Sequence, residues 1–283
     1  AARRTPAKQK MARRPATTAA LLLATIVWSA DALELRPALA AHRPRPARAS
    51  SRRANGSPAM SAVMVAERVC PAVGFVLSSA LYCSPLPTLR SCVSKGSLGQ
   101  FNPLPSALMV IGTTAWLGYG LSVQNPWIAA TNVPGTLVAI AQLVVMLPLM
   151  RPGRQLTQVQ ATVLGGATCT TLLWAKLIFG GVSSAVRSRV LGTYATIICI
   201  ALFASPLSTI STVVKTRNAA SVLAPLTASQ VLNCLMWTIY GVFAAKDIFV
   251  WGPNGTGLVL GLAQLALKLC FPSVGEGDKG AAA

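Results

Sequence analysis

Two asparagines lie in segments that are otherwise apolar. Asn132 begins the stretch NVPGTLVAIAQL and Asn254 begins NGTGLVLGLAQL. A carboxamide in an apolar medium costs several kcal/mol unless its N–H and C=O groups find partners, so both side chains must face protein or a cavity. One use is a hydrogen bond between helices, worth about 0.6 kcal/mol on average. The other is contact with a small polar molecule.

Groups that make or break bonds are sparse. The one histidine, His42, lies near the N-terminus, so no Ser–His or Cys–His nucleophile can form in the hydrophobic part of the chain. The seven cysteines contain no CxxC pair and no zinc spacing, and we expect them as buried free thiols. No paired carboxylates converge either. We therefore expect no enzyme, no metal and no cofactor.

The composition predicts a protein that crosses a membrane several times. Hydrophobic residues make up 53% of the 283-residue chain and charged residues 11%, against about a quarter charged in typical globular proteins. Mean hydropathy is +0.57. Apolar runs of about 20 residues match the thickness of a bilayer core. The seven expected helices cover roughly residues 68–89, 104–123, 127–149, 158–180, 190–213, 222–244 and 248–271.

The first 66 residues differ from the rest. They hold twelve Lys or Arg and two acids, which is +10 of the net charge of +19. From Met11, a basic start, a short apolar core and small residues have the layout of a signal peptide, and the Arg-, Ala- and Ser-rich stretch that follows is typical of a transit peptide. One uncleaved basic tail is the alternative. The scarcity of aromatic residues argues against nucleic-acid binding.

The hydrophobic part contains an internal repeat. Sliding the chain on itself by 121 residues aligns 84–120 with 205–241 and gives ten identities in 37 positions, where apolar composition alone gives about three or four. With one inserted residue the match continues from Asn132 onto Asn254. The identical pairs include Ser84/Ser205, Pro85/Pro206, Thr88/Thr209, Trp116/Trp237, Tyr119/Tyr240 and Gly120/Gly241.

The repeat unit is three helices. Because three helices and one linker helix separate equivalent points, both units must have the same orientation in the membrane. The fold class is therefore an all-α membrane protein with seven transmembrane helices, arranged as two parallel three-helix repeats joined by a linker helix. The expected segments are a leader at 1–66, the first repeat at 67–150, linker helix 4 at 151–185, the second repeat at 186–272 and a tail at 273–283.

These motifs resemble a known family. SPxxT, a basic loop, a proline that opens the next helix, a tryptophan three residues before Tyr-Gly, and NxxG in the third helix are similar to the SWEET family of sugar transporters. The resemblance covers about residues 66–272. Parallel transporter repeats of this kind place the substrate near the middle of the membrane, at the interface between repeats. The resemblance thus implies a bidirectional sugar uniporter that works by alternating access.

The resemblance also implies a substrate site. Asn132 and Asn254 match positions that hydrogen-bond sugar hydroxyls. Trp116 and Trp237 would form two apolar plates around a slot that suits the CH-rich faces of a sugar ring, although a tryptophan in a membrane helix is also commonly an anchor or packing residue. Two indoles narrow the cavity, so we expect a monosaccharide such as glucose.

Gates at both ends follow from the same resemblance. Tyr119, Tyr240 and Asp247 match an outer gate, where tyrosine and aspartate close one entrance by hydrogen bonding. The first repeat has SVQN where a charged residue is often found, which leaves this gate unequal. Prolines weaken a helix by removing a backbone hydrogen bond and therefore suit a hinge, although a static kink is the alternative. The matching hinge and inner-gate residues are Pro85, Pro105, Pro206 and Pro225.

The positions of the Asp and Glu residues indicate whether transport is coupled to protons. Proton-driven transporters keep carboxylates or histidines inside the bundle. After residue 66 the acids are Glu67, Asp247, Glu276 and Asp278, near expected helix ends or in the tail. We therefore expect an uncoupled uniporter, in which two three-helix units rock about the site.

Two other classes remain open at this stage. One is a PQ-loop carrier of another small metabolite, although each helix-opening proline here is followed by Leu or Ser and not by Gln. The other, more remote, is a retinal-binding seven-helix protein with Lys268 as the Schiff-base lysine; Gln264 stands one turn earlier, and neighbouring helices supply no carboxylate counter-ion.

The loops predict an orientation. Basic residues number seven on the side of loops 1–2, 3–4, 5–6 and the C-terminus, and three on the other side, so the C-terminus is expected in the cytoplasm. We expect the membrane to be the plasma membrane, an endomembrane or a plastid membrane. The expected partners are a sugar and the lipid bilayer, with no nucleic acid; a homo-oligomer is left open.

Overall fold

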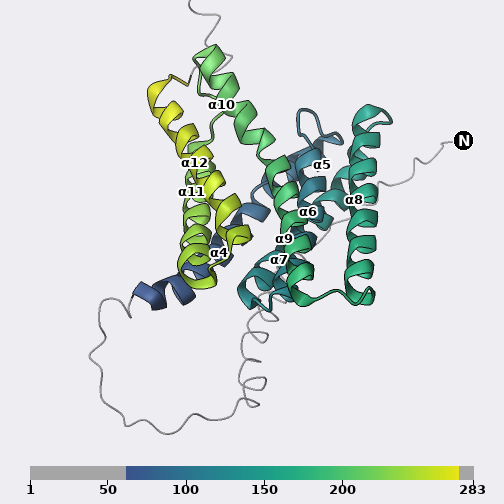
Figure 1. Ribbon diagram of the computed structural model, residues 1–283. Coiled ribbons are helices and arrows are strands. Elements are labelled where there is room, and N and C mark those ends of the chain that lie inside the picture. Colours follow the sequence, from purple (N-terminus) through teal and green to yellow (C-terminus); the bar gives the residue numbers. More distant parts are fainter. Residues whose placement is uncertain (1–61, 274–283) are drawn as a thin grey trace, which may run out of the picture. The chain divides into compact units, whose positions relative to one another are not determined.

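The computed structural model describes residues 62–273 (Figure 1), so the expected signal and transit segments lie outside the described residues. The described part is helical throughout. Six of its helical segments are long and apolar enough to cross a membrane. A seventh, α12, has 23 residues and so has membrane length, but it falls outside that group of six. The elements are η2 (Val65–Val69), α4 (Cys70–Cys83), α5 (Leu86–Lys95), α6 (Leu104–Ser122), α7 (Pro126–Met146), η3 (Leu147–Leu149), α8 (Arg154–Phe179), α9 (Ser184–Leu202), α10 (Ala204–Thr216), α11 (Ala224–Ile239), η4 (Tyr240–Ala245) and α12 (Ile248–Cys270).

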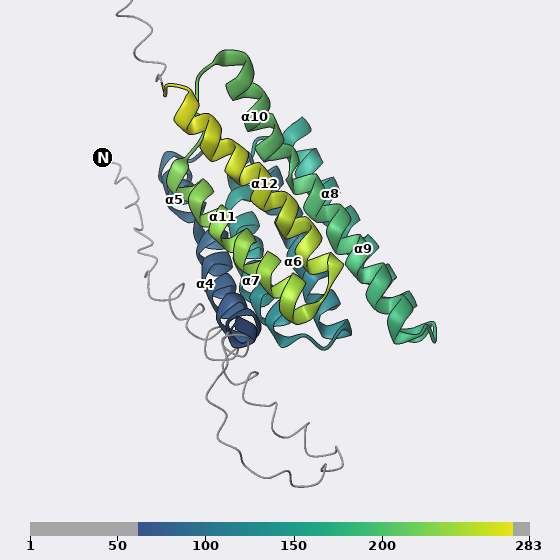
Figure 2. The same ribbon diagram turned by 60° about the vertical axis from the view of Figure 1, so that its left-hand side comes forward.

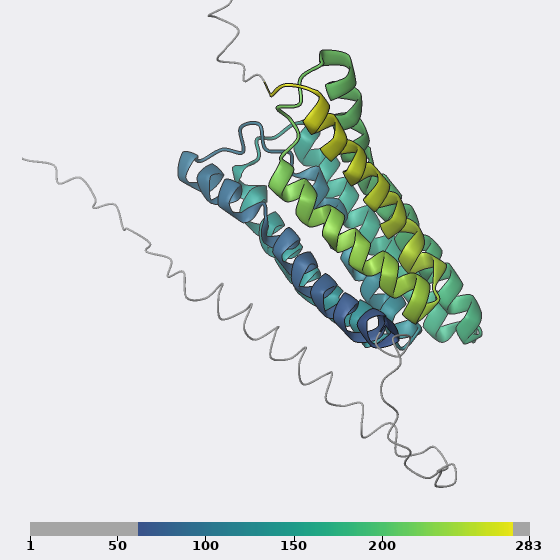
Figure 3. The ribbon, with the colours of Figure 1, turned by 90° about the vertical axis from the view of Figure 1, so that its left-hand side faces the viewer.

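The first and fifth transmembrane helices are longer than the sequence predicts, and each is broken near its proline. The first begins by residue 62 rather than 68 and is interrupted between α4 and α5, where Pro85 is the N-cap of α5. The fifth begins at Ser184 rather than 190 and breaks at Phe203, three residues before Pro206. Both continue past the apolar run as amphipathic helices, which hydropathy alone does not detect. Figure 3 shows the long course of the first helix.

The repeats are parallel and interlocked. Helices α4 and α9 open the two repeats and run toward the same end of the bundle (Figure 1). In each repeat the third helix contacts both the first and the second: α7 packs on α4 and α6, and α12 packs on α9 and α11. Between repeats, α6 packs on α9 and α11 on α4. Figure 2 shows α11 and α12 side by side. The expected architecture of two three-helix repeats and a linker is confirmed.

The repeated Tyr-Gly pair has a packing reason. A Cβ atom at Gly120 would lie 2.6 Å from the backbone nitrogen of Ala129 on α7, and one at Gly241 would lie 2.7 Å from that of Trp251 on α12. Only glycine lets the second and third helices of each repeat approach so closely. The linker helix α8 packs on α6 through a similar notch at Gly166, where a Cβ would lie 2.1 Å from Ile111.

Candidate functional site

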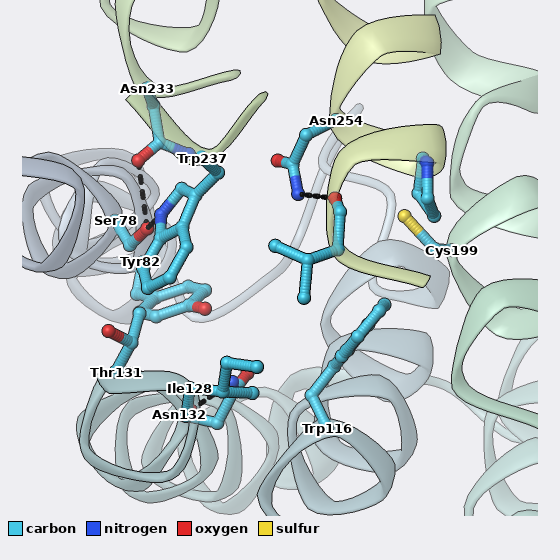
Figure 4. Close-up of a pocket in the computed structure, with 12 residues that line it drawn as sticks. Ser78, Tyr82, Trp116, Ile128, Thr131, Asn132, Cys199, Asn233, Trp237 and Asn254 are labelled. Carbon is cyan, nitrogen blue, oxygen red and sulfur yellow. Dashed lines mark hydrogen bonds between the residues drawn. The ribbon is translucent and has the colours of Figure 1, made fainter. Parts of the chain in front are cut away.

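A central hollow of about 130 Å³ lies where the helices of the two repeats meet (Figure 4). Both repeats contribute to its wall, and each side chain in that wall is neutral or only weakly ionising. The twelve lining residues are Ser78, Tyr82, Trp116, Ile128, Thr131, Asn132, Cys199, Asn233, Trp237, Val250, Pro253 and Asn254.

The two repeat-related asparagines enter this hollow in the same way. The amide nitrogen of Asn132 donates to the carbonyl oxygen of Ile128, and that of Asn254 donates to the carbonyl oxygen of Val250, each at 2.8 Å. One N–H is thereby used within the helix, which fixes the rotation of the carboxamide. No described residue donates to either side-chain oxygen. Figure 4 shows the oxygen of Asn254 turned toward the hollow. The side-chain oxygen of each asparagine is therefore free to accept a hydrogen bond from a bound molecule.

The two tryptophans line the hollow from opposite repeats, but they are held differently. Each rests edge-on against the tyrosine one turn later in its own repeat: ring centroids are 5.6 Å apart for Trp116 and Tyr119, and 5.7 Å apart for Trp237 and Tyr240. Trp237 is also tied to the first repeat, because its Nε1 donates to Ser78 Oγ at 3.3 Å. The 121-residue offset places Cys199 opposite Trp116 in the role of Ser78, and no such bond forms there.

A buried polar pair joins the repeats beside Trp237. Ser78 Oγ on α4 donates to Asn233 Oδ1 on α11 at 2.9 Å, and both side chains are buried. Trp237 follows Asn233 by one helical turn, and a Cβ at Gly74, one turn before Ser78, would lie 2.8 Å from the Trp237 indole nitrogen. Gly74 thus provides the notch into which the indole fits. The arrangement gives Trp237 a fixed orientation.

The hollow is closed at the end that carries the tyrosines, which we call the tyrosine end. Tyr119 Oη donates to Asp247 Oδ2 at 2.5 Å, and Asn125 Nδ2 donates to Tyr240 Oη at 2.6 Å. Asn125 and Asp247 are equivalent positions, since each is the N-cap of the third helix of its repeat. Each repeat therefore holds the tyrosine of the other. Ile128 and Val250 pack behind these bonds with the tyrosine rings in one buried cluster.

The opposite end, which we call the proline end, is open. A hollow of about 320 Å³ shares Ser78, Tyr82 and Asn132 with the central one and reaches Pro85 and Pro105. A further hollow of about 480 Å³ shares Tyr82 and Cys199 with both and reaches Pro206. The three hollows form one path from the centre to the proline end.

The structure brings most, but not all, of the predicted site residues together. Asn132, Asn254, Trp116 and Trp237 meet in one hollow, and Tyr119, Tyr240 and Asp247 meet at its closed end. Three prolines line the open path, whereas Pro225 is exposed and lines none of the three hollows. The functional roles of these residues stay predictions.

Several residues that shape the site were missed. Asn125 closes the tyrosine end as a neutral counterpart of Asp247, although its segment was read only as lacking a charge. The 121-residue repeat with its one insertion maps Asp247 onto Asn125 and would have identified it. Ser78, Tyr82 and Asn233 carry no such signal, because the second copy has Cys199 and Phe203 in place of the first two, and the first copy has Gly112 in place of Asn233.

Chemically, the hollow suits a neutral guest with hydroxyl groups and apolar faces. Amide oxygens accept hydrogen bonds from hydroxyls, and indole faces contact C–H groups. The described residues contain no group of three or more His, Cys, Asp or Glu that could hold a metal ion. Lys268, considered above as a Schiff-base lysine, lies near the end of α12, where its Nζ donates to the carbonyl oxygen of Ala219 at 2.9 Å and to Ser273 Oγ at 2.7 Å. It does not line the central hollow.

Comparison with known proteins agrees with this geometry. The family described as "Sugar efflux transporter for intercellular exchange" matches residues 69–152 and 189–274, once in each repeat. The chain belongs to this family. Helix α8, which lies between the two matched segments, is the linker.

Similar proteins are named as sugar transporters. The bidirectional sugar transporter SWEET11 of Arabidopsis thaliana is 29% identical over 214 residues, which cover 73% of this chain and 73% of the relative. The sugar transporter SWEET1 of Drosophila pseudoobscura pseudoobscura is 26% identical, with 69% of this chain and 83% of the relative covered. A solved structure of a eukaryotic SWEET transporter superposes with a TM-score of 0.67 at 22% identity and covers 73% of this chain and 97% of that one. At that identity the superposition shows the fold, which is the multi-pass membrane fold of the family.

Proposed function

We propose that this chain is a bidirectional sugar uniporter that moves a monosaccharide such as glucose down its gradient. The strongest support is the convergence of two equivalent asparagines and two equivalent tryptophans on one hollow that is closed at one end and open at the other. The names of the relatives favour a sugar over the other small metabolites of a PQ-loop carrier. The narrow central hollow favours a single sugar ring.

The mechanism is a rocking of the two repeats about the site. In the conformation described, sugar reaches Asn132 and Asn254 from the proline end. To release it at the other end, the protein must break the bonds from Tyr119 to Asp247 and from Asn125 to Tyr240, and close the path past the prolines. Each gate tyrosine packs against the tryptophan of its own repeat, so a tyrosine that moves outward changes the support of an indole plate.

The proposal includes transport without a coupled ion. Within residues 62–273 the carboxylates are Glu67, which is exposed on η2, and Asp247, which is used at the tyrosine end. Neither lines the central hollow. A sugar can therefore bind and leave without a change of protonation at the site.

The proline end is proposed to face the cytoplasm, together with the C-terminus. It carries Arg90 and Lys95 on α5, and Lys215 and Arg217 near the end of α10. Cytoplasmic segments next to membrane helices are enriched in Lys and Arg. A cysteine-free variant with the single substitution Lys95→Cys would be labelled by an impermeant thiol reagent only after the membrane is opened; labelling of intact cells would contradict this orientation.

The test of function is uptake and efflux of radiolabelled sugars in cells that lack their own sugar transporters. The expected result is equilibrating glucose transport in both directions, with weaker transport of disaccharides. Cells that accumulate none of a broad sugar panel, despite surface-expressed protein, would contradict the proposal.

A further inference from the structure

Tyr82 occupies a special place on the path through the protein. It stands near the end of α4, three residues before Pro85, and it lines the central hollow and both hollows that lead to the proline end. Tyr82 is thus at the neck that a molecule must pass between the centre and the open end. Neither the repeat nor the motifs of the sequence single it out.

The ring and the backbone of Tyr82 are both fixed by α7. A Cβ atom at Gly135 would lie 2.7 Å from Tyr82 Cε2 and 2.8 Å from Cζ, so the ring is seated in a notch that only glycine provides. Gln142 Nε2 donates to the carbonyl oxygen of Tyr82 at 2.8 Å. Because both the ring and its attachment are held, the position of the phenol oxygen is fixed before any guest arrives.

The hydroxyl of Tyr82 has no hydrogen-bond partner among the described residues. Figure 4 shows it directed into the space between Trp237, Asn254 and Asn132. A phenol in largely apolar surroundings is usually hydrogen-bonded, because an unpaired hydroxyl loses its interaction with water. The oxygen therefore has capacity for a guest in the hollow.

The second repeat shows that packing does not require this oxygen. The 121-residue offset places Phe203 at the position of Tyr82. Phe203 lies beside Gly257, the counterpart of Gly135, although less closely: a Cβ there would lie 3.5 Å from Phe203 Cε1, an ordinary packing distance. A phenyl ring thus satisfies the structural role in one copy, whereas the other copy carries an additional hydroxyl that faces the hollow.

We propose that Tyr82 is a specificity-determining residue whose hydroxyl hydrogen-bonds one hydroxyl of the transported sugar. This inference rests on the proposed function. The two asparagines are equivalent and contact a sugar from both repeats. The hydroxyl of Tyr82 is present in the first repeat alone, because its counterpart is Phe203. A sugar with a hydroxyl at the matching position is thereby held in one orientation and preferred over sugars that lack it.

The experiment pairs a change in the protein with a change in the sugar. Unlabelled glucose and each monodeoxyglucose compete against radiolabelled glucose uptake, for the wild type and for Tyr82→Phe. One neutral hydrogen bond corresponds to a loss of about three- to tenfold in affinity. In the wild type, the monodeoxyglucose that lacks the contacted hydroxyl should compete weaker by that factor. In Tyr82→Phe, the inhibition constant of glucose should rise by the same factor. The inhibition constant of that monodeoxyglucose should equal its value for the wild type.

The other monodeoxyglucoses separate a direct contact from a general loss of binding. Sugars that lack a hydroxyl bound by Asn132 or Asn254 should bind weaker than glucose by the same factor in Tyr82→Phe as in the wild type, because those contacts are unchanged. The matched control is Tyr194→Phe, since the hydroxyl of Tyr194 shares a hydrogen bond of 2.7 Å with Thr170 Oγ1 and does not line the central hollow. Its pattern of inhibition constants should equal that of the wild type.

Ratios of inhibition constants do not depend on how much protein reaches the membrane, so reduced expression of a variant does not disturb the result. If Tyr82→Phe retains the full penalty for every monodeoxyglucose, Tyr82 does not contact the sugar, while the proposed function stands as long as the wild type transports glucose. A wild type that transports no sugar overturns both proposals.

Discussion

The two repeats are alike at the tyrosine end and different at the proline end. At the tyrosine end the N-cap residue of each repeat bonds the tyrosine of the other. At the proline end the first repeat is closed by Gln142, which is fully buried, accepts from Ser106 Oγ at 2.8 Å and donates to the carbonyl oxygen of Tyr82. In the second repeat the equivalent Gln264 makes one long contact, 3.4 Å from the carbonyl oxygen of Pro206.

The residue types in the second repeat permit the same closure. Thr227 stands in the position of Ser106, but its hydroxyl donates within its own helix, to the carbonyl oxygen of Leu223 at 3.1 Å. Gln264 and Thr227 line the 480 Å³ hollow at the open end, and Gln142 and Ser106 line the 320 Å³ hollow beside it. The two repeats therefore differ in bonding at this end: Gln142 ties α7 to α6 and α4, whereas Gln264 makes one long contact, so the first repeat is the more rigidly packed.

The largest effect should come from the site, where the repeats are most alike. Asn132→Ala and Asn254→Ala should each abolish sugar uptake while the protein still inserts, because a site that recognises hydroxyls by hydrogen bonds loses recognition when its partners are removed. Radiotracer uptake at matched surface expression measures this. If only one variant loses transport, the two repeats contribute unequally at the centre as well; wild-type uptake in both would remove the asparagines from the site.

The glutamines should separate the repeats by stability. Gln142→Ala leaves the Ser106 hydroxyl and the Tyr82 carbonyl without a partner, at a cost of about 1–3 kcal/mol. Gln264→Ala removes one long contact of a half-buried side chain and should cost less than about 0.6 kcal/mol. Thermal unfolding in detergent should therefore show a fall of several degrees for the first variant and almost none for the second. Equal falls would contradict the view of a rigid first repeat.

The gate bonds should differ because only one of them involves a charge. Tyr119→Phe removes a bond to the carboxylate of Asp247, worth about 1.5–3 kcal/mol, and Tyr240→Phe removes a neutral bond with Asn125, worth about 0.5–1.5 kcal/mol. Cys70 lies in the same buried cluster as both tyrosines and reports on opening. Its labelling by an impermeant thiol reagent, followed by mass spectrometry, should rise more in Tyr119→Phe. The reverse order would show that the charge does not strengthen the gate.

The indole plates offer a smaller effect. Trp116 lines the hollow without the bond to a serine that holds Trp237, so Trp116→Ser should enlarge the hollow without breaking a hydrogen bond between repeats. Loss of a stacking contact of about 1 kcal/mol corresponds to roughly fivefold weaker glucose binding. Disaccharides should gain entry, so the ratio of disaccharide to glucose uptake should rise. A constant ratio would make Trp116 an ordinary packing residue.

Collapse of the proton gradient should have no effect on sugar uptake. Asp247 carries a carboxylate and its counterpart Asn125 a neutral amide, so the two gate bonds differ in charge. If this charge serves closure and not coupling, protonophores should leave net uptake unchanged and the sugar should never exceed equilibrium across the membrane. Uphill accumulation that collapses with the pH gradient would make Asp247 a proton site.

Sequence alone predicts what the two copies share. Hydropathy and the 121-residue offset identify the helices, their parallel arrangement and the equivalent pairs at the centre, because each follows from side chains that recur. Tyr82 and Asn233 stay hidden, since neither residue has an identical counterpart in the other copy. The difference between Gln142 and Gln264 could not be predicted at all, because two identical residues with similar neighbours make different contacts in the two repeats.

Asn125 and Asp247 each use separate atoms for two bonds. The Oδ1 atom of Asn125 accepts from the backbone nitrogens of Trp127 and Ile128, and Oδ1 of Asp247 accepts from that of Phe249. The remaining atom of each side chain, Nδ2 or Oδ2, reaches the tyrosine. The tyrosines can therefore detach while α7 and α12 keep their N-terminal caps. Each transport cycle then leaves the first turn of both helices folded, and opening of the tyrosine end needs no local unfolding that would slow the return of the empty carrier.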